Sequence, residues 1–442
     1  MSFEFDTLKV QAGYQASQHN NAVSVPIYQT AAFTLGDSYR ADRLFSFSEE
    51  DPIYTRLSNP TVDVLEKRTA AIHGAAGAIA LASGMAAVSY TLLNVAGKGG
   101  HILTTARLYG GTVDSFGHLL PDLGIQIDIV EDPDHPEEFL KKLTPDTKAI
   151  FIESLTNPFA TIPDFEAIAQ IAHSHGIPLI VDNTLATPYL FNPFTYGADI
   201  VVYSATKAFS GHGNVIAGIV VESGRFPYDN GNFPHFEKPL WFLRDEQEKE
   251  RSILQVFPDI PFTGRLRAVH LNYLGAALSP FDAYLILLGL ETISERVEKQ
   301  VSNTKAVLQY LEKAEHVSWI RYPYAEGNPY RNLADRYFPK GAGSVLSFGF
   351  FGTEEQKRKF LESTKIFGYQ ANIGDARSLI INPAQTTHVE LTEKQRELVG
   401  LGAETIRLSL GLESAADLIA DLEQAFRKAF TIETADKDYK NE

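Results

Sequence analysis

Two patterns of apolar residues alternate along the middle of the chain. Short apolar runs such as AIALAS (78–83) are followed by stretches such as GMAAVSYTLLNVA (84–96), in which apolar residues recur at helical spacing. Further short apolar runs lie at residues 101–105, 125–130, 148–154, 178–183, 199–204 and 216–223. Strands that alternate with helices of about 10 to 15 residues predict an α/β fold with a mixed, mostly parallel sheet covered by helices on both faces.

The flanking segments have different patterns, which suggests four regions. Residues 1–60 are rich in turns and aromatics without a sustained period, so we expect an arm that lies over another surface. Residues 61–279 form the predicted large domain, with an insertion at about 224–276 that has no clean period. Apolar residues at helical spacing predict one long bridging helix over 280–315 and a small α+β domain over 316–442.

Composition excludes several classes of function. The 442 residues include 39 basic and 55 acidic ones, a formal charge of −16, which disfavours a broad nucleic-acid surface. Cysteine is absent, so disulfides, thiolate metal sites and cysteine nucleophiles are excluded. No apolar stretch reaches the ~18 to 20 residues of a membrane span and no secretion signal is recognisable, so we expect a cytoplasmic protein without a membrane partner. The terminal TADKDYKNE (434–442) is expected to be frayed.

Polar residues with chemical potential follow the predicted strands. Ligands of such sheets gather at the carboxyl ends of the strands, so these residues are expected to meet. Ser83 and Gly84 stand at a strand-to-helix turn, where the helix N-terminus holds a phosphate or Ser83 serves only as an N-cap. Asn157 and Asp182 each follow a later strand. Asp182, after the apolar run PLIV, either caps the two residues after it or meets a cation such as a protonated ring nitrogen.

Lys207 lies in YSATKAFSGHG (203–213) and has no carboxylate within several residues in sequence. It is either an ordinary solvated lysine or an amine that bonds covalently to a carbonyl. Burial lowers the pKa of a lysine and leaves more of its amine in the neutral, nucleophilic form. Hydroxyls at Ser204 and Thr206 for a phosphate, Asp182 for a pyridinium and the lysine amine together form the set that pyridoxal phosphate requires.

A family resemblance is carried by seven segments: YTRLSNPT (54–61), ALASGMAA (80–87), YGGT (109–112), IVDNTLATP (180–188), YSATKAFSGHG (203–213), NPAQTTH (382–388) and IRLSLGLE (406–413). In this order they closely resemble the pyridoxal-phosphate-dependent enzymes of cysteine and methionine metabolism, over nearly the whole chain. The resemblance implies a fold-type I, aspartate-aminotransferase-like architecture and pyridoxal 5′-phosphate as the cofactor.

The resemblance also implies roles for the matching residues. Lys207 would be the Schiff-base lysine, Asp182 the partner of the ring nitrogen and Tyr109 the residue that stacks on the ring, and these three are the expected catalytic residues. The expected cofactor-binding residues are Tyr54, Arg56, Ser83, Gly84, Met85, Tyr109, Asn157, Asp182, Thr184, Ser204, Thr206 and Lys207. The expected substrate-binding residues are Arg407, which would grip the carboxylate, with Asn372 and Tyr54. Tyr54 and Arg56 would reach a neighbouring subunit's phosphate, which implies a homo-oligomer of at least two subunits, with a tetramer expected.

Three further segments resemble the O-acetylhomoserine sulfhydrylases within that family: NIGDARS (372–378), the insertion through GAALSPF (275–281), and LIINPAQTTH (379–388). The chain departs from the usual family pattern at Leu185, Asn382 and Gln385. The implied reaction is a γ-replacement in methionine biosynthesis, in which sulfide or a small thiol replaces the acetate of O-acetyl-L-homoserine and gives homocysteine or methionine. A cystathionine γ-synthase or γ-lyase, and a non-catalytic ligand-binding relative, are the alternatives.

Two histidines, His212 and His388, lie inside these motifs. Neither has a second ligand at the spacing that metal sites show, so both are predicted to be structural and no metal is expected.

Overall fold

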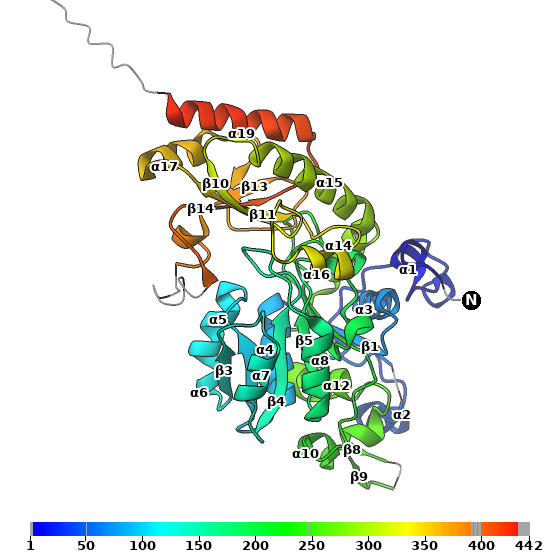
Figure 1. Cartoon of the computed structure of the whole chain (residues 1–442). Coiled ribbons are helices and arrows are strands. Elements are labelled where there is room, and N and C mark those ends of the chain that lie inside the picture. Colours follow the sequence, from blue (N-terminus) through cyan, green and yellow to red (C-terminus); the bar gives the residue numbers. More distant parts are fainter. Residues whose placement is uncertain are drawn as a thin grey trace, which may run out of the picture.

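The computed structural model describes residues 3–431 except 50, 246, 390, 391, 393–395, 397 and 398. The tail at 434–442, expected to be frayed, lies outside these residues. A large domain and a smaller C-terminal domain lie one above the other (Figure 1). Within the described part of the chain, no helix is long and apolar enough to cross a membrane.

The large domain is built on a seven-stranded sheet with strand order β1-β7-β6-β5-β4-β2-β3. Its strands are Gly77–Leu81 (β1), His101–Thr105 (β2), Gln126–Val130 (β3), Thr147–Glu153 (β4), Leu179–Asp182 (β5), Ile200–Ser204 (β6) and Gly218–Glu222 (β7). β7 pairs antiparallel with β1 and β6, and every other neighbouring pair is parallel. The predicted mixed, mostly parallel sheet is therefore confirmed.

Each face of this sheet is covered by its own apolar core, because successive strand residues point to opposite faces. In β5, Leu179 and Val181 join one core and Ile180 joins the other. The first core includes α3 (Pro60–His73), α8 (Phe165–Ser174) and α14 (Pro280–Leu290). The second includes α4 (Gly84–Ala96), α12 (Pro261–Arg265) and the π-helix η3 (Leu266–Leu271). Strands buried on both faces have continuous apolar runs, which explains their pattern in the sequence.

Shorter elements complete the large domain. The other helices of its core region are α5 (Gly110–Gly117), α6 (Leu119–Asp122), α7 (Glu137–Lys142), α9 (Thr187–Leu190) and η2 (Pro193–Tyr196). Besides α12 and η3, the insertion contains α10 (Pro234–Glu237), the hairpin β8 (Leu240–Arg244) and β9 (Glu250–Arg251), α11 (Ile253–Val256) and α13 (Asn272–Leu274). The N-terminal arm contains α1 (Phe5–Gln11), η1 (Ala16–Gln18) and α2 (Ser38–Phe45), and α1 packs on α3.

The small domain has a five-stranded sheet with strand order β10-β11-β14-β13-β12. Its strands are Val317–Arg321 (β10), Val345–Phe350 (β11), Gly368–Tyr369 (β12), Leu379–Ile381 (β13) and Thr405–Ser409 (β14). Its helices are α16 (Arg331–Tyr337), α17 (Glu354–Ser363), η4 (Pro383–Gln385) and α19 (Ala415–Phe430). α17 and α19 pack against each other (Figure 1).

The segment predicted as one helix over 280–315 forms two helices. α14 ends at Leu290, and α15 (Ile293–Leu311) begins after Thr292, whose φ of −120° and ψ of 20° are not helical. α14 packs on α3 of the large domain, whereas α15 packs against α19 of the small domain. The interruption therefore lies where the chain passes from one domain to the other.

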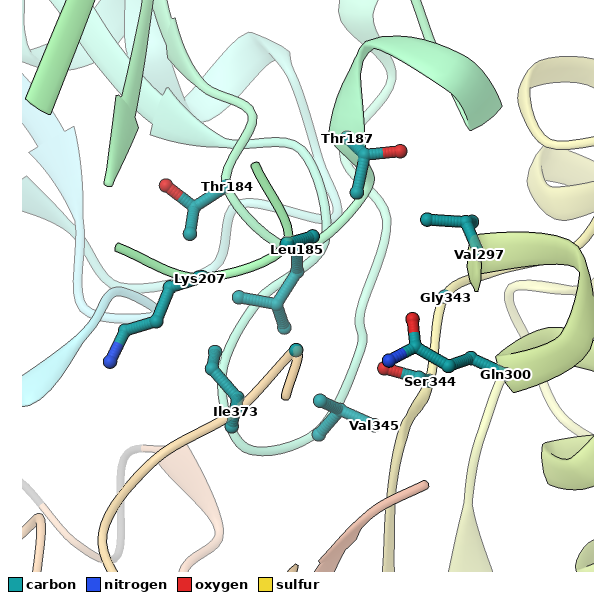
Figure 2. Close-up of a pocket in the computed structure, with 12 residues that line it drawn as sticks. Thr184, Leu185, Thr187, Lys207, Val297, Gln300, Gly343, Ser344, Val345 and Ile373 are labelled. Carbon is teal, nitrogen blue, oxygen red and sulfur yellow. The ribbon is translucent and has the colours of Figure 1, made fainter. Parts of the chain in front are cut away.

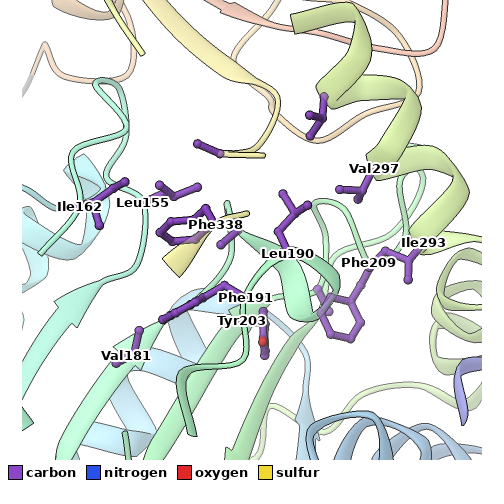
Figure 3. Close-up of a cluster of buried hydrophobic side chains, with 14 of the residues drawn as sticks. Leu155, Ile162, Val181, Leu190, Phe191, Tyr203, Phe209, Ile293, Val297 and Phe338 are labelled. Atoms are coloured by element: carbon purple, nitrogen blue, oxygen red, sulfur yellow. The ribbon is translucent and has the colours of Figure 1, made fainter. Parts of the chain in front are cut away.

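One apolar core continues across the domain junction. Ile293 and Val297 of α15 belong to the same buried cluster as Leu190 and Phe209 of the large domain, and Figure 3 shows the four side chains together. Phe338, from the small domain, belongs to the same cluster. Apolar surface buried between the two domains thus holds them together. Each Å² of apolar surface removed from water contributes roughly 25 cal/mol of stabilising free energy.

Candidate active site

A cavity of about 330 Å³ opens at the carboxyl ends of β4, β5 and β6, between the two domains. It is lined by most of the residues predicted from the sequence: Ser83, Gly84, Met85, Tyr109, Asn157, Asp182, Thr184, Ser204, Thr206, Lys207, Asn372 and Arg407. The structure thus brings together residues from widely separated parts of the chain. The residues of the large domain meet because they end or follow strands whose carboxyl ends lie at the same edge of the sheet, and Asn372 and Arg407 join them from the small domain.

Lys207 follows β6 and is partly buried. Its Nζ donates to Oδ1 of Asn372 at 2.7 Å. Burial, followed by the positive charge of Arg407, lowers the pKa of Lys207 to about 8. A much smaller cavity of about 10 Å³, the size of one water molecule, lies beside it, and the amine points away from that space (Figure 2). Lys207 therefore presents to the main cavity an amine that loses its proton more readily than an ordinary lysine does.

Asp182 is the last residue of β5, and among the described residues its carboxylate accepts hydrogen bonds only from Thr184, at 2.9 Å from the backbone N and 2.6 Å from Oγ1. The Thr184 hydroxyl in turn accepts the backbone N–H of Ser204 at 2.8 Å. Burial raises the pKa of Asp182 to about 6. The aspartate caps Thr184, as the first sequence interpretation expected for one of its two residues, and it lines the cavity, where a contact with a ring nitrogen stays a prediction. A cation placed against it would stabilise its charged form.

Ser83, Gly84 and Met85 begin α4 at one end of the cavity. The Ser83 hydroxyl accepts the N–H of Ala86 at 3.0 Å, so Ser83 is an N-cap. The first N–H groups of a helix have no partner within it, and they attract anions. A Cβ on Gly84 would lie 2.7 Å from the Cβ of Ser204, so only glycine lets the helix start approach β6 this closely.

Arg407 lies in β14 of the small domain and is 2% exposed. Nη1 donates to Oδ1 of Asn157 at 3.1 Å and Nη2 to the carbonyl oxygen of Asn372 at 3.0 Å, whereas Nε is buried without a partner. Burial lowers the pKa of Arg407 to about 10, so the guanidinium is charged near neutral pH. A buried cation with an unpaired donor at a cavity wall is suited to a carboxylate ligand.

Glu153 was missed in the sequence although it lines the cavity. It ends β4, and its carboxyl group accepts the N–H of Tyr109 at 2.5 Å and that of Asn157 at 3.3 Å. Burial, and then the neighbouring Asp182, raise the pKa of Glu153 well above its ordinary value. The signal was available, because AIFIE ends an apolar run with a carboxylate just as PLIVD does.

Tyr54 and Arg56 are the predicted residues that do not line this chain's cavity. Arg56 stacks over the ring of Tyr54 at 5.2 Å, and Tyr54 is 43% exposed. Within this chain the pair lies apart from the residues that line the cavity, and its contact with a neighbouring subunit stays a prediction.

The two histidines have different surroundings. Nδ1 of His212 lies 2.5 Å from the carbonyl oxygen of Ser210, and Nδ1 of His388 lies 2.9 Å from Oγ1 of Thr387. Burial lowers the pKa of His388 to about 4, so its ring is neutral near pH 7. Among the described residues, no group of three or more potential metal ligands occurs.

These residues fit pyridoxal phosphate. A buried carboxyl group without a cationic partner suits the pyridinium nitrogen, a helix N-terminus that only glycine can form suits the phosphate, and Lys207 offers an amine. The family sequence model of the Cys/Met metabolism PLP-dependent enzymes matches residues 6–427 of the chain. The chain belongs to this family.

Members of the Cys/Met metabolism family resemble the chain over their full lengths. It is 42% identical to Sulfhydrylase FUB7 of Fusarium oxysporum f. sp. lycopersici, over 96% of this chain and 98% of that protein. It is 40% identical to O-acetyl-L-homoserine sulfhydrylase 1 of Thermus thermophilus, over 95% and 99%.

A solved structure from Campylobacter jejuni, named a "putative O-acetylhomoserine (thiol)-lyase", has a TM-score of 0.91 and 38% identity, over 96% of this chain and 100% of that chain. It contains N′-pyridoxyl-lysine-5′-monophosphate. The family, fold class, enzyme character and cofactor predicted from the sequence are thereby confirmed.

Proposed function

We propose that the protein catalyses γ-replacement on O-acetyl-L-homoserine, with sulfide or a small thiol as nucleophile, and forms homocysteine or methionine and acetate. One observation carries the choice of substrate. Lys207 and Arg407 are the only lysine, arginine or histidine side chains among the described residues that line the cavity. The lysine is required for the cofactor and the arginine for the α-carboxylate, so no cation is left for a second carboxylate on the acyl group. An uncharged acetyl group therefore fits better than a succinyl group.

The apolar wall supports the same choice. Seven apolar side chains among the described residues line the cavity: Met85, Val88, Leu155, Leu185, Ile216, Ala371 and Ile373. They offer the acetyl group a surface without a polar group to desolvate. They also limit the water that could compete with the sulfur nucleophile.

The side chains divide the chemistry among them. Pyridoxal phosphate, when bound, supplies an electron sink that makes the substrate's Cα and Cβ protons removable. Asp182 would hold the proton on the ring nitrogen, and the Lys207 amine would move protons at Cα and Cβ. Arg407 would fix the α-carboxylate with its guanidinium group at the cavity wall. At Cγ the bond to the acetate oxygen breaks and acetate leaves with that bond's electron pair. Sulfide or the thiol supplies the pair of the new Cγ–S bond and gives up its own proton, and the protons taken from Cα and Cβ are returned.

Oligomerisation would complete the site. Tyr54 and Arg56 lie outside the cavity of their own chain and are paired with each other. We propose that they bind the phosphate in a neighbouring subunit of a homodimer or homotetramer, located in the cytoplasm, with residues 1–60 as the connecting arm. Light scattering of wild type and Arg56→Ala, together with the cofactor affinity of each, would test this.

A product assay tests the activity. Purified protein loaded with pyridoxal phosphate is given sulfide with O-acetyl-L-homoserine or O-succinyl-L-homoserine, and homocysteine is quantified. In a separate reaction it is given cystathionine, and cysteine and 2-oxobutanoate are quantified. We expect homocysteine and equimolar acetate from the acetyl ester at a rate at least about tenfold above that from the succinyl ester, a difference of about 1.4 kcal/mol. Lys207→Ala serves as the inactive control. Absence of homocysteine from the acetyl ester, or cleavage of cystathionine as the faster reaction, would overturn the assignment.

A further inference from the structure

Glu153 is a buried carboxyl group in the cavity wall that the roles above leave unused. Its Cα is paired in register with that of Asp182 across the parallel strands β4 and β5. Residues paired in this way point to the same face, so both carboxyl groups reach the cavity side by side. Glu153 is only 5% exposed. Burying a carboxyl group next to another one costs free energy of folding unless hydrogen bonds offset that cost. The hydrogen bonds of Glu153 therefore indicate its role.

Those contacts are two backbone N–H groups on different segments. Oε1 accepts the N–H of Tyr109, the N-cap residue of α5, and Oε2 accepts the N–H of Asn157, four residues after the strand. Asn157 in turn accepts Nη1 of Arg407 through its side chain. One carboxyl group thus connects the residue expected to lie on the cofactor ring with the arginine expected to hold the substrate.

We propose that Glu153 is a positioning residue: it holds Tyr109 over the cofactor ring and, through Asn157, holds Arg407 in place for the substrate carboxylate. Burial, and then the neighbouring Asp182, raise the pKa of Glu153 well above its ordinary value, whereas a cation placed against Asp182 would favour the charged form of Asp182. Glutamine has the same size as glutamic acid and carries no charge, and its amide oxygen can keep the shorter bond to Tyr109.

The chain offers a matched control. Glu222 also ends a strand, is 2% exposed and accepts backbone N–H groups, from Phe262 at 2.9 Å and from Thr263 at 2.8 Å. It does not line the cavity. Loss of Glu222 should therefore destabilise the fold as loss of Glu153 does, without disturbing the site.

The test compares Glu153→Ala, Glu153→Gln and Glu222→Ala with wild type. Cofactor-free protein is titrated with pyridoxal phosphate to obtain the dissociation constant, and the cofactor's circular-dichroism band reports how its ring is held. Thermal unfolding midpoints of the cofactor-free proteins report the structural effect alone. KM and kcat for the amino-acid substrate are measured last, and only this measurement depends on the proposed function.

We expect Glu153→Ala to raise the cofactor dissociation constant about tenfold, as expected for the loss of a buried hydrogen-bond acceptor, and to weaken the circular-dichroism band. KM should rise more than kcat falls. Glu153→Gln should restore the dissociation constant to within about threefold of wild type. Glu222→Ala should lower the unfolding midpoint while the constant and the band stay unchanged.

Two results would overturn the proposal. One is a Glu153→Ala protein whose dissociation constant, band and KM all match wild type. The other is an equal effect of Glu222→Ala on the dissociation constant and the band. If Glu153→Ala does not fold, Glu153→Asp replaces it, because its shorter side chain draws the carboxyl group away from both N–H groups. The same two results then decide. A failed sulfhydrylase assay with the expected cofactor results would refute the proposed substrate and leave the role of Glu153 standing.

Discussion

Replacing Arg407 by lysine keeps the positive charge and removes the guanidinium, so it separates the contribution of the hydrogen-bonding geometry from that of the charge. A guanidinium carries five N–H groups. Arg407 uses one N–H on Asn157 and one on Asn372, and Nε is unpaired. A guanidinium at the cavity wall can bind the two oxygens of a carboxylate with a fork of two N–H groups. Lysine keeps the charge but cannot form this fork while holding both asparagines.

The magnitude follows from the bonds lost. A hydrogen bond to a charged group contributes about 1.5 to 3 kcal/mol. Loss of one of the two bonds in the fork corresponds to substrate binding weaker by about 10- to 150-fold. We expect KM for the amino-acid substrate to rise by this factor, while kcat falls less and the cofactor dissociation constant stays near that of wild type.

Steady-state kinetics and a cofactor titration check this, with Arg265→Lys as the control. Arg265 resembles Arg407 in its chemistry: burial lowers its pKa to about 10, its Nε is buried without a partner and its Nη1 donates to Asn94 at 2.8 Å. It does not line the cavity. A KM for Arg407→Lys within twofold of wild type, or an equal rise in Arg265→Lys, would refute the reasoning.

Three other perturbations have definite outcomes. Gly84→Ala should weaken cofactor binding about tenfold, because its Cβ would lie 2.7 Å from that of Ser204; an unchanged titration would contradict this. In cofactor-free protein, reaction of Lys207 with an aldehyde should increase with pH about a midpoint near 8, because burial lowers its pKa to about 8, and a midpoint near the ordinary 10.5 would count against it. Burial raises the pKa of Glu222 to about 7 from 4.5. The stabilisation from this carboxyl group is thus complete below pH 4.5 and is lost as pH rises through 7. Over that range the free energy of unfolding of Glu222→Gln should therefore increase by up to about 3 kcal/mol relative to that of wild type. Denaturant unfolding at each pH would reveal this, and a constant difference would exclude it.

The strands and the position of the site could be predicted from the sequence for one physical reason. Strands buried on both faces need continuous apolar runs, and their polar ends must then lie at the cavity. The same rule applies to Glu153, whose apolar run AIFI (149–152) ends in a carboxylate just as the run before Asp182 does. Its partners, Tyr109 and Asn157, become apparent only when β2 and β4 lie side by side.

Tertiary contacts explain the break in the predicted bridging helix. Both halves of 280–315 have helical spacing, so the sequence pattern alone does not mark the interruption at Thr292. Nη1 of Arg296, in the first turn of α15, donates to the carbonyl oxygen of Ala208 at 2.9 Å, and such a distant contact leaves no local signal. Tyr54 and Arg56 lie outside the cavity for a related reason, because their proposed partner is on another chain.

The cavity draws its two halves from separate domains. Lys207 and Asp182 come from the large sheet, whereas Asn372 and Arg407 come from the small domain. The two halves meet at Asn372, which accepts Nζ of Lys207 with its side chain and Nη2 of Arg407 with its carbonyl oxygen. For protein engineering this means that a library at Ala371 and Ile373, with Asn372 kept, would sample new amino-acid substrates while the reactive lysine retains its hydrogen-bond acceptor. Selection for growth on an alternative amino-acid donor would then act on recognition.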